Sequence, residues 1–149
     1  MRISWIHILS LIIINVSNTF AQEEVLLDTA TIYTDFRIAL KNKEEVIKLS
    51  LKKQKLKKLP EELFTSFPNL LWLDISKNHL DSLDQRICEI NGLQYLDISK
   101  NVLTTLPESI GKLKKLKRLI ISQNKLEDCK QFRPYLLLHL CTWIFYMRG

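Results

Sequence analysis

The chain has 149 residues, of which 46% are hydrophobic and 26% are charged, so its length suits one globular domain rather than a two-domain enzyme. Its three glycines are too scattered for a phosphate-binding loop, and its three cysteines and three histidines lack the spacings of common zinc sites. We therefore expect a non-enzymatic protein with no cofactor and no bound metal, whose formal net charge of +6 is compatible with an anionic partner.

Residues 1–21 have the pattern of a secretory signal peptide. They begin with a single basic residue, Arg2, continue with a short apolar stretch and end in small residues before a cleavage point ahead of Gln22. The apolar stretch is much shorter than the roughly 20 residues that a membrane-spanning helix needs, so a retained anchor is the minor alternative. We expect an exported protein that is extracellular, periplasmic or on the cell surface, with no stable transmembrane span in the mature chain.

Residues 22–45 are expected to form an N-terminal cap segment with a helix over 31–42. Four apolar residues share one face of this segment at helical spacing: Ile32, Phe36, Ala39 and Leu40. The candidate N-cap residues are Thr29 and Thr31. We expect Phe36 and Leu40 to cover the open edge of the segment that follows.

Residues 46–129 contain four copies of one pattern, in steps of 24, 23 and 23 residues. Each copy reads apolar-x-x-Leu-x-apolar-x-x-Asn/Gln-x-Leu, and the copies open at Val46, Leu70, Leu93 and Leu116. The fourth and sixth positions form one inward face of a short strand, and strands of successive copies would pair in parallel. A single copy cannot bury its apolar face alone, so the period predicts a stack of repeats.

The ninth position of each copy carries a side-chain amide: Gln54, Asn78, Asn101 and Asn124. At the turn after each strand, backbone groups would be buried without partners, so an amide is needed there to donate and accept hydrogen bonds. The longer Gln54 is expected to be tolerated because the first copy has no neighbour on one side. Apolar pairs further along each copy would cover the core from the opposite side: Leu63 with Phe67, Ile87 with Ile90, and Ile110 with Leu113.

This pattern resembles the leucine-rich repeat family, and it is most similar to short bacterial repeats with Leu-Pro-x-x-Leu or Leu-Pro-x-x-Ile after the turn, as at 59–63 and 106–110. The resemblance implies an α/β leucine-rich repeat solenoid with a parallel concave β-sheet and an irregular or short-helical convex side. It also implies partner binding through the concave sheet, without specifying the partner.

The outward-facing positions on the concave sheet are the third, fifth, seventh and eighth of each copy. Large aromatic residues and arginine dominate binding hot spots, and two aromatics flanked by cations occupy the third position. We predict a partner-binding site, for a protein more than for a glycan, at six residues: Lys48, Trp72, Asp74, Tyr95, Asp97 and Arg118. The alternative is that Trp72 and Tyr95 only cover the sheet as a stacked cross-strand pair.

Lysines crowd residues 41–58 and 112–118, mostly as expected for a solvated surface. Nucleic acid is a poor partner for an exported chain, because lysine supplies charge but little bidentate phosphate recognition. Two alternatives to a protein-binding module remain. One is a basic, surface-associated structural protein that adheres to an anionic glycan, envelope polymer or lipid, and the other is a fragment of a longer repeat protein.

The pattern degrades after Leu126, and residues 130–149 form an atypical apolar tail. We keep three interpretations of this tail: a truncated C-terminus, an apolar cap, and a tail that associates with a membrane or is covered by a partner. Its apolar run of 13 residues is short for a membrane span. Cys129 with Cys141 is the only plausible disulfide within the chain. A cysteine left unpaired, such as Cys88, could be buried, free or bonded to another molecule, and we favour buried core thiols.

Overall fold

A computed structural model describes residues 22 and 25–126, which fall into two units that divide after Ala30. In the first unit, residues 25–29 are helical, and Thr29 Oγ1 donates a hydrogen bond to the carbonyl of Val25 at 2.9 Å. The expected signal peptide and the apolar tail lie outside the described residues, together with Cys129 and Cys141.

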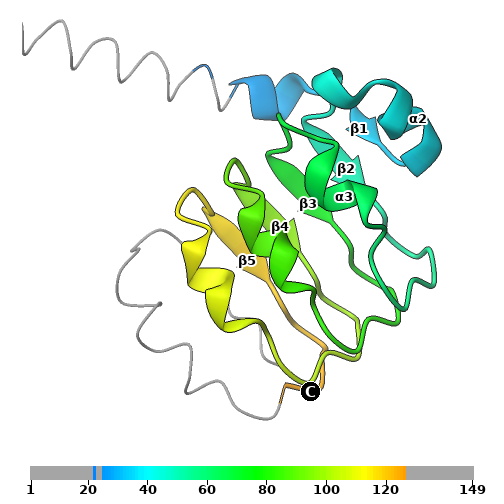
Figure 1. Cartoon of the computed structure of the whole chain (residues 1–149), viewed down its shortest axis with the longest axis vertical. Coiled ribbons are helices and arrows are strands. Elements are labelled where there is room, and N and C mark those ends of the chain that lie inside the picture. Colours follow the sequence, from blue (N-terminus) through cyan, green and yellow to red (C-terminus); the bar gives the residue numbers. More distant parts are fainter. Residues whose placement is uncertain (1–21, 23–24, 127–149) are drawn as a thin grey trace, which may run out of the picture. The chain divides into compact units, whose positions relative to one another are not determined.

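The second unit is built on a five-stranded parallel sheet in the order β1-β2-β3-β4-β5 (Figure 1). The strands are β1 (Ile32–Tyr33), β2 (Lys48–Ser50), β3 (Trp72–Asp74), β4 (Tyr95–Asp97) and β5 (Arg118–Ile120). The strand register places the four fourth-position leucines side by side: Leu49, Leu73, Leu96 and Leu119. None of these leucines is more than 3% exposed, which confirms the predicted apolar interior.

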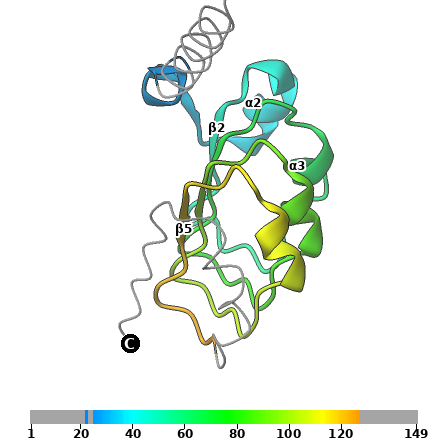
Figure 2. The ribbon, with the colours of Figure 1, turned by 90° about the vertical axis from the view of Figure 1, so that its left-hand side faces the viewer.

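Short helical segments return the chain from one strand to the next on one side of the sheet (Figure 2). They are α3 (Glu62–Thr65) and the 3-10 helices η2 (Gln85–Glu89) and η3 (Glu108–Lys112). The predicted apolar pairs all lie in the buried core: Leu63, Phe67, Ile87, Ile90, Ile110 and Leu113. The predicted α/β solenoid with a short-helical convex side is therefore confirmed.

The N-terminal end of this unit differs from the helix predicted over 31–42. Ile32–Tyr33 form β1, which pairs with β2, and only Phe36–Lys41 form a helix, α2, followed by the 3-10 helix η1 (Lys43–Glu45). A strand is favoured at this place because the edge of β2 has backbone groups that only another strand can pair regularly. Ile32 and Tyr33 are also residue types with high strand propensity.

The cap of α2 is Asp35, and the predicted caps Thr29 and Thr31 are wrong. Asp35 Oδ1 accepts hydrogen bonds from the backbone N–H groups of Arg37 and Ile38 at 2.8 and 3.3 Å. The carboxylate thereby satisfies two of the amides that have no partner inside the first turn of a helix.

Three of the four residues predicted to share an apolar face lie on α2 and pack against the core, whereas Ile32 lies in β1 and is 47% exposed. Ala39 is completely buried, and Phe36 and Leu40 pack against the core. The Phe36 ring meets the ring of Phe67 edge-on, with centroids 5.8 Å apart. The segment therefore joins the same core as the repeats.

Replacing Asp35 with alanine is expected to lower the free energy of unfolding by about 1 kcal/mol, because two N–H groups lose their acceptor. Thr31→Ala is the matched control and should change stability by less than about 0.5 kcal/mol. Urea denaturation followed by circular dichroism measures both values. A larger loss in the threonine variant would contradict the capping role of Asp35.

Cys88 lies in η2 as a buried free thiol, as predicted. Burial is the main cause that raises the pKa of the thiol. A buried thiol with a raised pKa is a poor nucleophile, so this cysteine is part of the core rather than a reactive site.

Candidate functional site

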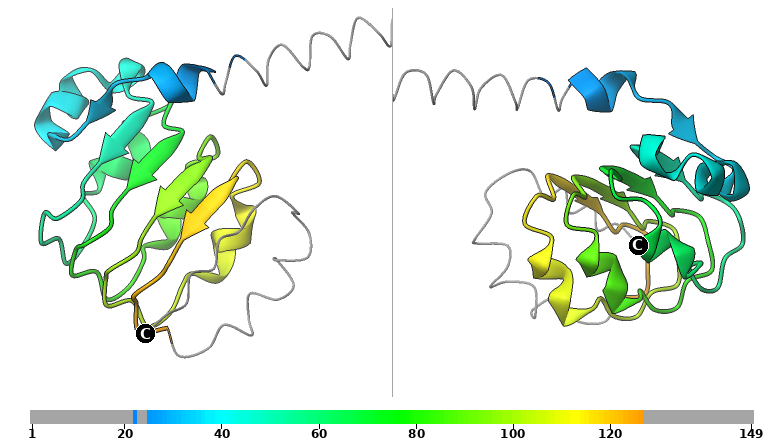
Figure 3. Two further views of the ribbon diagram at one scale, coloured as in Figure 1. Left: turned by 180° about the vertical axis from the view of Figure 1, so that it is seen from behind. Right: turned by 45° about the horizontal axis from the view of Figure 1, so that its top comes forward.

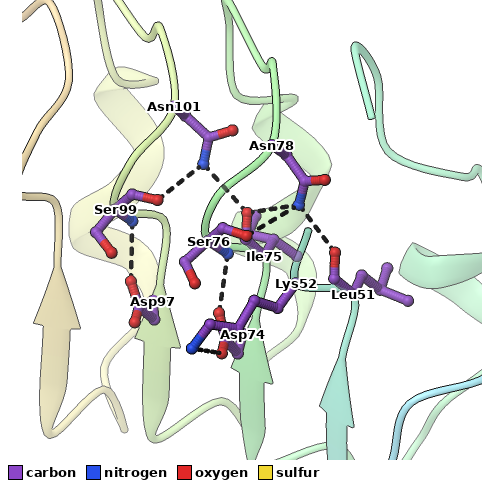
Figure 4. A network of polar contacts seen from close by, with 9 residues as sticks. All are labelled: Leu51, Lys52, Asp74, Ile75, Ser76, Asn78, Asp97, Ser99 and Asn101. Atoms are coloured by element: carbon purple, nitrogen blue, oxygen red, sulfur yellow. Dashed lines mark hydrogen bonds and ion pairs between the residues drawn. The ribbon is translucent and has the colours of Figure 1, made fainter. Parts of the chain in front are cut away.

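A ladder of asparagines at the ninth position holds the turns after β3, β4 and β5, and Figure 4 shows the first two of them, Asn78 and Asn101. Asn78 Oδ1 accepts hydrogen bonds from the backbone N–H groups of Gln54 and Leu56, at 3.0 and 3.1 Å. Its Nδ2 group donates to the carbonyls of Leu51 and Ile75, at 2.9 Å each. One side chain thus joins the backbone of its own repeat to that of the preceding one, which confirms the predicted role of the ninth position.

Asn101 and Asn124 repeat this arrangement in the next two repeats. Their Oδ1 atoms accept from the N–H groups of Leu80 and Leu103, both at 3.1 Å. Their Nδ2 groups bind carbonyls of their own and of the preceding repeat at 2.9 to 3.1 Å. The same geometry in three successive repeats makes the end of each strand a rigid frame for the side chains around it.

Gln54 differs from the prediction in one respect. We expected a longer amide to be tolerated because the first repeat has no neighbour, but β1 and the residues after it lie on that side. Gln54 Nε2 donates to the carbonyl of Thr34 at 3.2 Å. The extra methylene lets the amide reach this neighbouring segment.

The residue before each ladder amide has a left-handed backbone. The φ angles of these four residues lie between 55° and 60°: Lys53, Lys77, Lys100 and Gln123. The first three donate backbone N–H bonds to the seventh-position carbonyls of the next repeat, Ser76, Ser99 and Ser122, at 3.1, 2.9 and 2.9 Å. The backbone register of the strands therefore continues through the eighth position.

These registers divide the strand side of the sheet, opposite the helical returns, into four bands that run across the repeats (Figure 3, left). We call this side the open face. The aromatic band is the third position (Lys48, Trp72, Tyr95, Arg118), and the carboxylate band is the fifth (Ser50, Asp74, Asp97, Ile120). The serine band is the seventh (Lys52, Ser76, Ser99, Ser122), and the lysine band is the eighth (Lys53, Lys77, Lys100, Gln123).

In the aromatic band, Trp72 and Tyr95 stack on each other. Their ring centroids are 4.9 Å apart and their planes differ by 13°, while the Arg118 guanidinium lies 6.0 Å from the centroid of Tyr95. Both rings remain partly exposed. The stacked cross-strand pair that we kept as an alternative is therefore present, and it still leaves ring surface accessible to a partner.

The stack sets which parts of the rings a ligand can reach. Trp72 covers one face of Tyr95, and Arg118 lies over the same ring from the next strand. The pKa of Tyr95 is raised, mainly by burial and then by the nearby carboxylates of Asp97 and Asp74. The phenol therefore stays neutral, and Tyr95 offers ring edges and a hydroxyl rather than a free aromatic face.

The carboxylate and serine bands are less open than predicted. Asp74 is only 5% exposed, and Ser76 and Ser99 are also buried. Asp74 Oδ1 accepts the N–H of Ser76 at 2.9 Å, and its Oδ2 lies 3.6 Å from Lys52 Nζ (Figure 4). The carboxylate is held in this place because it accepts the N–H of Ser76, the second backbone amide after the strand, so direct contact with a partner is restricted at this residue.

Asp97 has the same local geometry but is half-buried. Its Oδ1 accepts the N–H of Ser99 at 2.9 Å, as Asp74 does for Ser76 in the preceding repeat. Of the six predicted site residues, five keep accessible surface: Lys48, Trp72, Tyr95, Asp97 and Arg118. The sheet register places these residues in two neighbouring bands.

The sequence placed the lysine band at an outward position but gave it no role in binding. The signal was present in the sequence, because lysine directly precedes the ladder asparagine in two successive repeats, at Lys77 and Lys100. Within residues 22 and 25–126, no group of three or more His, Cys, Asp or Glu residues is arranged to hold a metal ion.

Comparison with known proteins agrees with this geometry. The family model described as leucine rich repeat matches residues 88–126. The fold is a leucine-rich repeat solenoid. No curated protein matches the chain.

Two solved structures are similar to this solenoid. One is a leucine-rich repeat protein of Leptospira interrogans, with 28% identity and a TM-score of 0.53 over 64% of this chain and 30% of that protein. The other is internalin C2 of Listeria monocytogenes, with 20% identity and a TM-score of 0.54 over 66% of this chain and 41% of that protein. The chain thus spans less than half the length of either protein. The leucine-rich repeats support a general role as a protein-interaction module.

Proposed function

We propose that this leucine-rich repeat chain is an exported, non-enzymatic module that binds a protein partner through its open face. The observation that carries the proposal is the stacked pair of Trp72 and Tyr95 beside Arg118, at the centre of the sheet. Large, partly exposed aromatic rings next to an arginine are the residue types that contribute most to protein–protein affinity.

The rigidity of the open face supports this function. Each strand is paired with its neighbours, and the asparagine ladder holds the turns, so the aromatic band is fixed before a partner arrives. A preorganised surface loses little conformational entropy on binding, which leaves more of the contact energy as affinity.

The surroundings of the Tyr95 ring favour a protein over a glycan. Sugars that bind aromatic residues place an apolar ring face against an open aromatic face, and here Tyr95 has Trp72 on one face and Arg118 over the ring. Ring edges, a neutral hydroxyl and a guanidinium instead suit the mixed apolar and polar side chains of a protein surface.

Export is the second part of the proposal, and it rests on the basic, apolar and small-residue order of residues 1–21. Expression of the full chain followed by N-terminal sequencing of the protein outside the cytoplasm tests it. A new N-terminus at Gln22 is expected, and a chain retained in the cytoplasm with Met1 intact would contradict it. Within the described part of the chain, no helix has the length and apolar character needed to cross a membrane.

Replacing Trp72 with alanine is expected to weaken binding of the protein partner by about thirtyfold, because a hot-spot aromatic contributes about 2 kcal/mol. Phe64→Ala is the matched control, since Phe64 is a partly exposed aromatic on α3 whose ring contacts Arg86 at 4.7 Å. The partner would first be captured from the envelope or the medium by crosslinking to the purified chain, then titrated against each variant by calorimetry.

Both substitutions remove a side chain that packs on the protein, so each is expected to reduce stability by about 1 kcal/mol. Binding is therefore measured at a temperature where circular dichroism shows both variants to be folded. Equal affinity of the Trp72 variant and the wild-type chain would overturn the proposed binding face.

A further inference from the structure

Three lysines of the lysine band occupy a backbone conformation that lysine does not favour. Lys53, Lys77 and Lys100 have φ angles of 60°, 56° and 55°, a region that glycine and asparagine adopt far more readily. Each lysine is held there by its backbone N–H bond to the next repeat. The conformation belongs to the turn, whereas the choice of lysine needs a separate explanation.

Within the described part of the chain, no carboxylate forms an ion pair with Lys53, Lys77 or Lys100. Neighbouring parallel strands are about 4.8 Å apart, so residues at one position of successive repeats are close neighbours. Lys100 and Lys53 both lower the pKa of Lys77, as expected for crowded like charges. The carboxylate of Asp74 opposes this shift of the Lys77 pKa, but its ion pair is with Lys52.

The turn itself does not require a positive charge at this position. Gln123 occupies the eighth position of the fourth repeat, with a φ angle of 57°, and directly precedes the ladder asparagine of that repeat, Asn124. A neutral side chain of similar length therefore satisfies the fold. The lysines at the other three positions add mutual repulsion that a bound anion would relieve.

We propose that the lysine band binds the carboxylates of an acidic segment in the protein partner, lying across the first three repeats. This inference rests on the proposed function, because it assigns the partner's chemistry at a second part of the same open face. Lysine suits carboxylates of varied geometry, since its ammonium is a compact point charge on a flexible stem.

A protein segment fits the open face better than a uniform polyanion or an anionic bilayer does. The aromatic and lysine bands are five residues apart along each repeat, at most about 16 Å in extended chain. Between them lie the carboxylates of Asp74 and Asp97, which disfavour a surface that is negative everywhere. A protein can place acidic side chains on the lysines and apolar ones on Trp72 and Tyr95.

The test uses the full chain and a fluorescein-labelled peptide in which glutamates alternate with serine and glycine around a central leucine. A second peptide replaces every glutamate with glutamine, and phosphatidylglycerol–phosphatidylcholine vesicles serve as the lipid probe. Binding is measured by fluorescence anisotropy, or by vesicle cosedimentation, at low and at physiological ionic strength. Exposed charge pairs are screened by salt, so the affinity for the acidic peptide should fall as salt rises.

The variant Lys53→Gln, Lys77→Gln, Lys100→Gln removes the charges while keeping the residue type that Gln123 already shows to fit. The matched control is Lys112→Gln, Lys114→Gln, Lys115→Gln, which makes the same change of net charge at exposed lysines in and after η3. Three exposed ion pairs together predict about a tenfold loss of peptide affinity in the first variant and about a twofold loss or less in the second. The first variant should not melt at a lower temperature than the wild type.

Equal losses in the two variants, or no saturable binding of the acidic peptide to the wild type, would overturn the inference. Vesicle binding that needs the lysine band, without peptide binding, would overturn it in favour of lipid. Failure of the inference about the lysine band can be distinguished from failure of the proposed function. If Trp72→Ala still weakens the captured partner while the lysine variant does not, only the acidic segment is rejected.

Discussion

Replacing Asn101 with alanine is expected to lower the free energy of unfolding by about 3 kcal/mol, one of the two largest effects that we expect from a single substitution. Asn101 is buried, and its amide accepts from the N–H of Leu80 and donates to the carbonyls of Ile75 and Ile98. Truncation would leave these backbone groups without partners in a place from which water is excluded.

Gln54→Ala is the matched control, because Gln54 is the exposed member of the same column. Its side chain makes one hydrogen bond, from Nε2 to the carbonyl of Thr34. We expect a loss of about 1 kcal/mol or less. Denaturant titration with the linear extrapolation gives both values. If the two variants lose the same stability, the buried amide of Asn101 stabilises the fold no more than an exposed side-chain hydrogen bond does. The asparagine ladder would then not be what holds the turns.

The parts of the fold that were predictable depend on a chemical need that recurs at one place in every repeat. The inward leucines, the convex apolar pairs and the ladder asparagines each follow from burial or from unpaired backbone groups. Because Asn78, Asn101 and Asn124 meet the same need in successive repeats, an error in one alignment would have been visible in the others. Periodicity therefore gave both the strand positions and their register.

The structural features that the sequence did not predict depend on contacts with neighbouring segments, which a local sequence pattern does not contain. Strand β1 is only two residues long, so its strand propensity was hidden among apolar residues at helical spacing. Its formation depends on the free edge of β2. The burial of Asp74 has a similar origin. Alternation along the strand predicts an outward direction, but it does not predict the hydrogen bond to Ser76 and the ion pair with Lys52 that hold the carboxylate against the protein.

The residues of the aromatic band could be predicted from the sequence, but the geometry of their side chains could not. The third position was expected to face outward, and it does, yet the ring stack with Arg118 beside it depends on side-chain rotamers. The left-handed lysines were hidden for a different reason. Lysine rarely adopts that conformation, so propensity argues against it, and only the hydrogen bonds between repeats explain it.

Leu73→Ala is the second substitution with a large expected effect, a loss of about 2–5 kcal/mol in the free energy of unfolding. Leu73 is completely buried, and its strand is paired with a neighbour on each side, so a cavity there weakens two interfaces between repeats. Ile38→Ala is the control. Ile38 is 52% exposed on α2, and its truncation should cost about 0.5 kcal/mol or less.

This variant also separates stability from binding, because Leu73 points into the core while Trp72, beside it in β3, lies on the open face. In a repeat protein, stability is approximately the sum of the repeats and their interfaces, so the loss should appear as earlier unfolding of the whole described array. At a temperature where circular dichroism shows Leu73→Ala to be folded, its partner affinity should match that of the wild type. Reduced affinity in the folded state would mean that the cavity shifts β3, and that the aromatic band needs the packing beneath it as well as its own side chains.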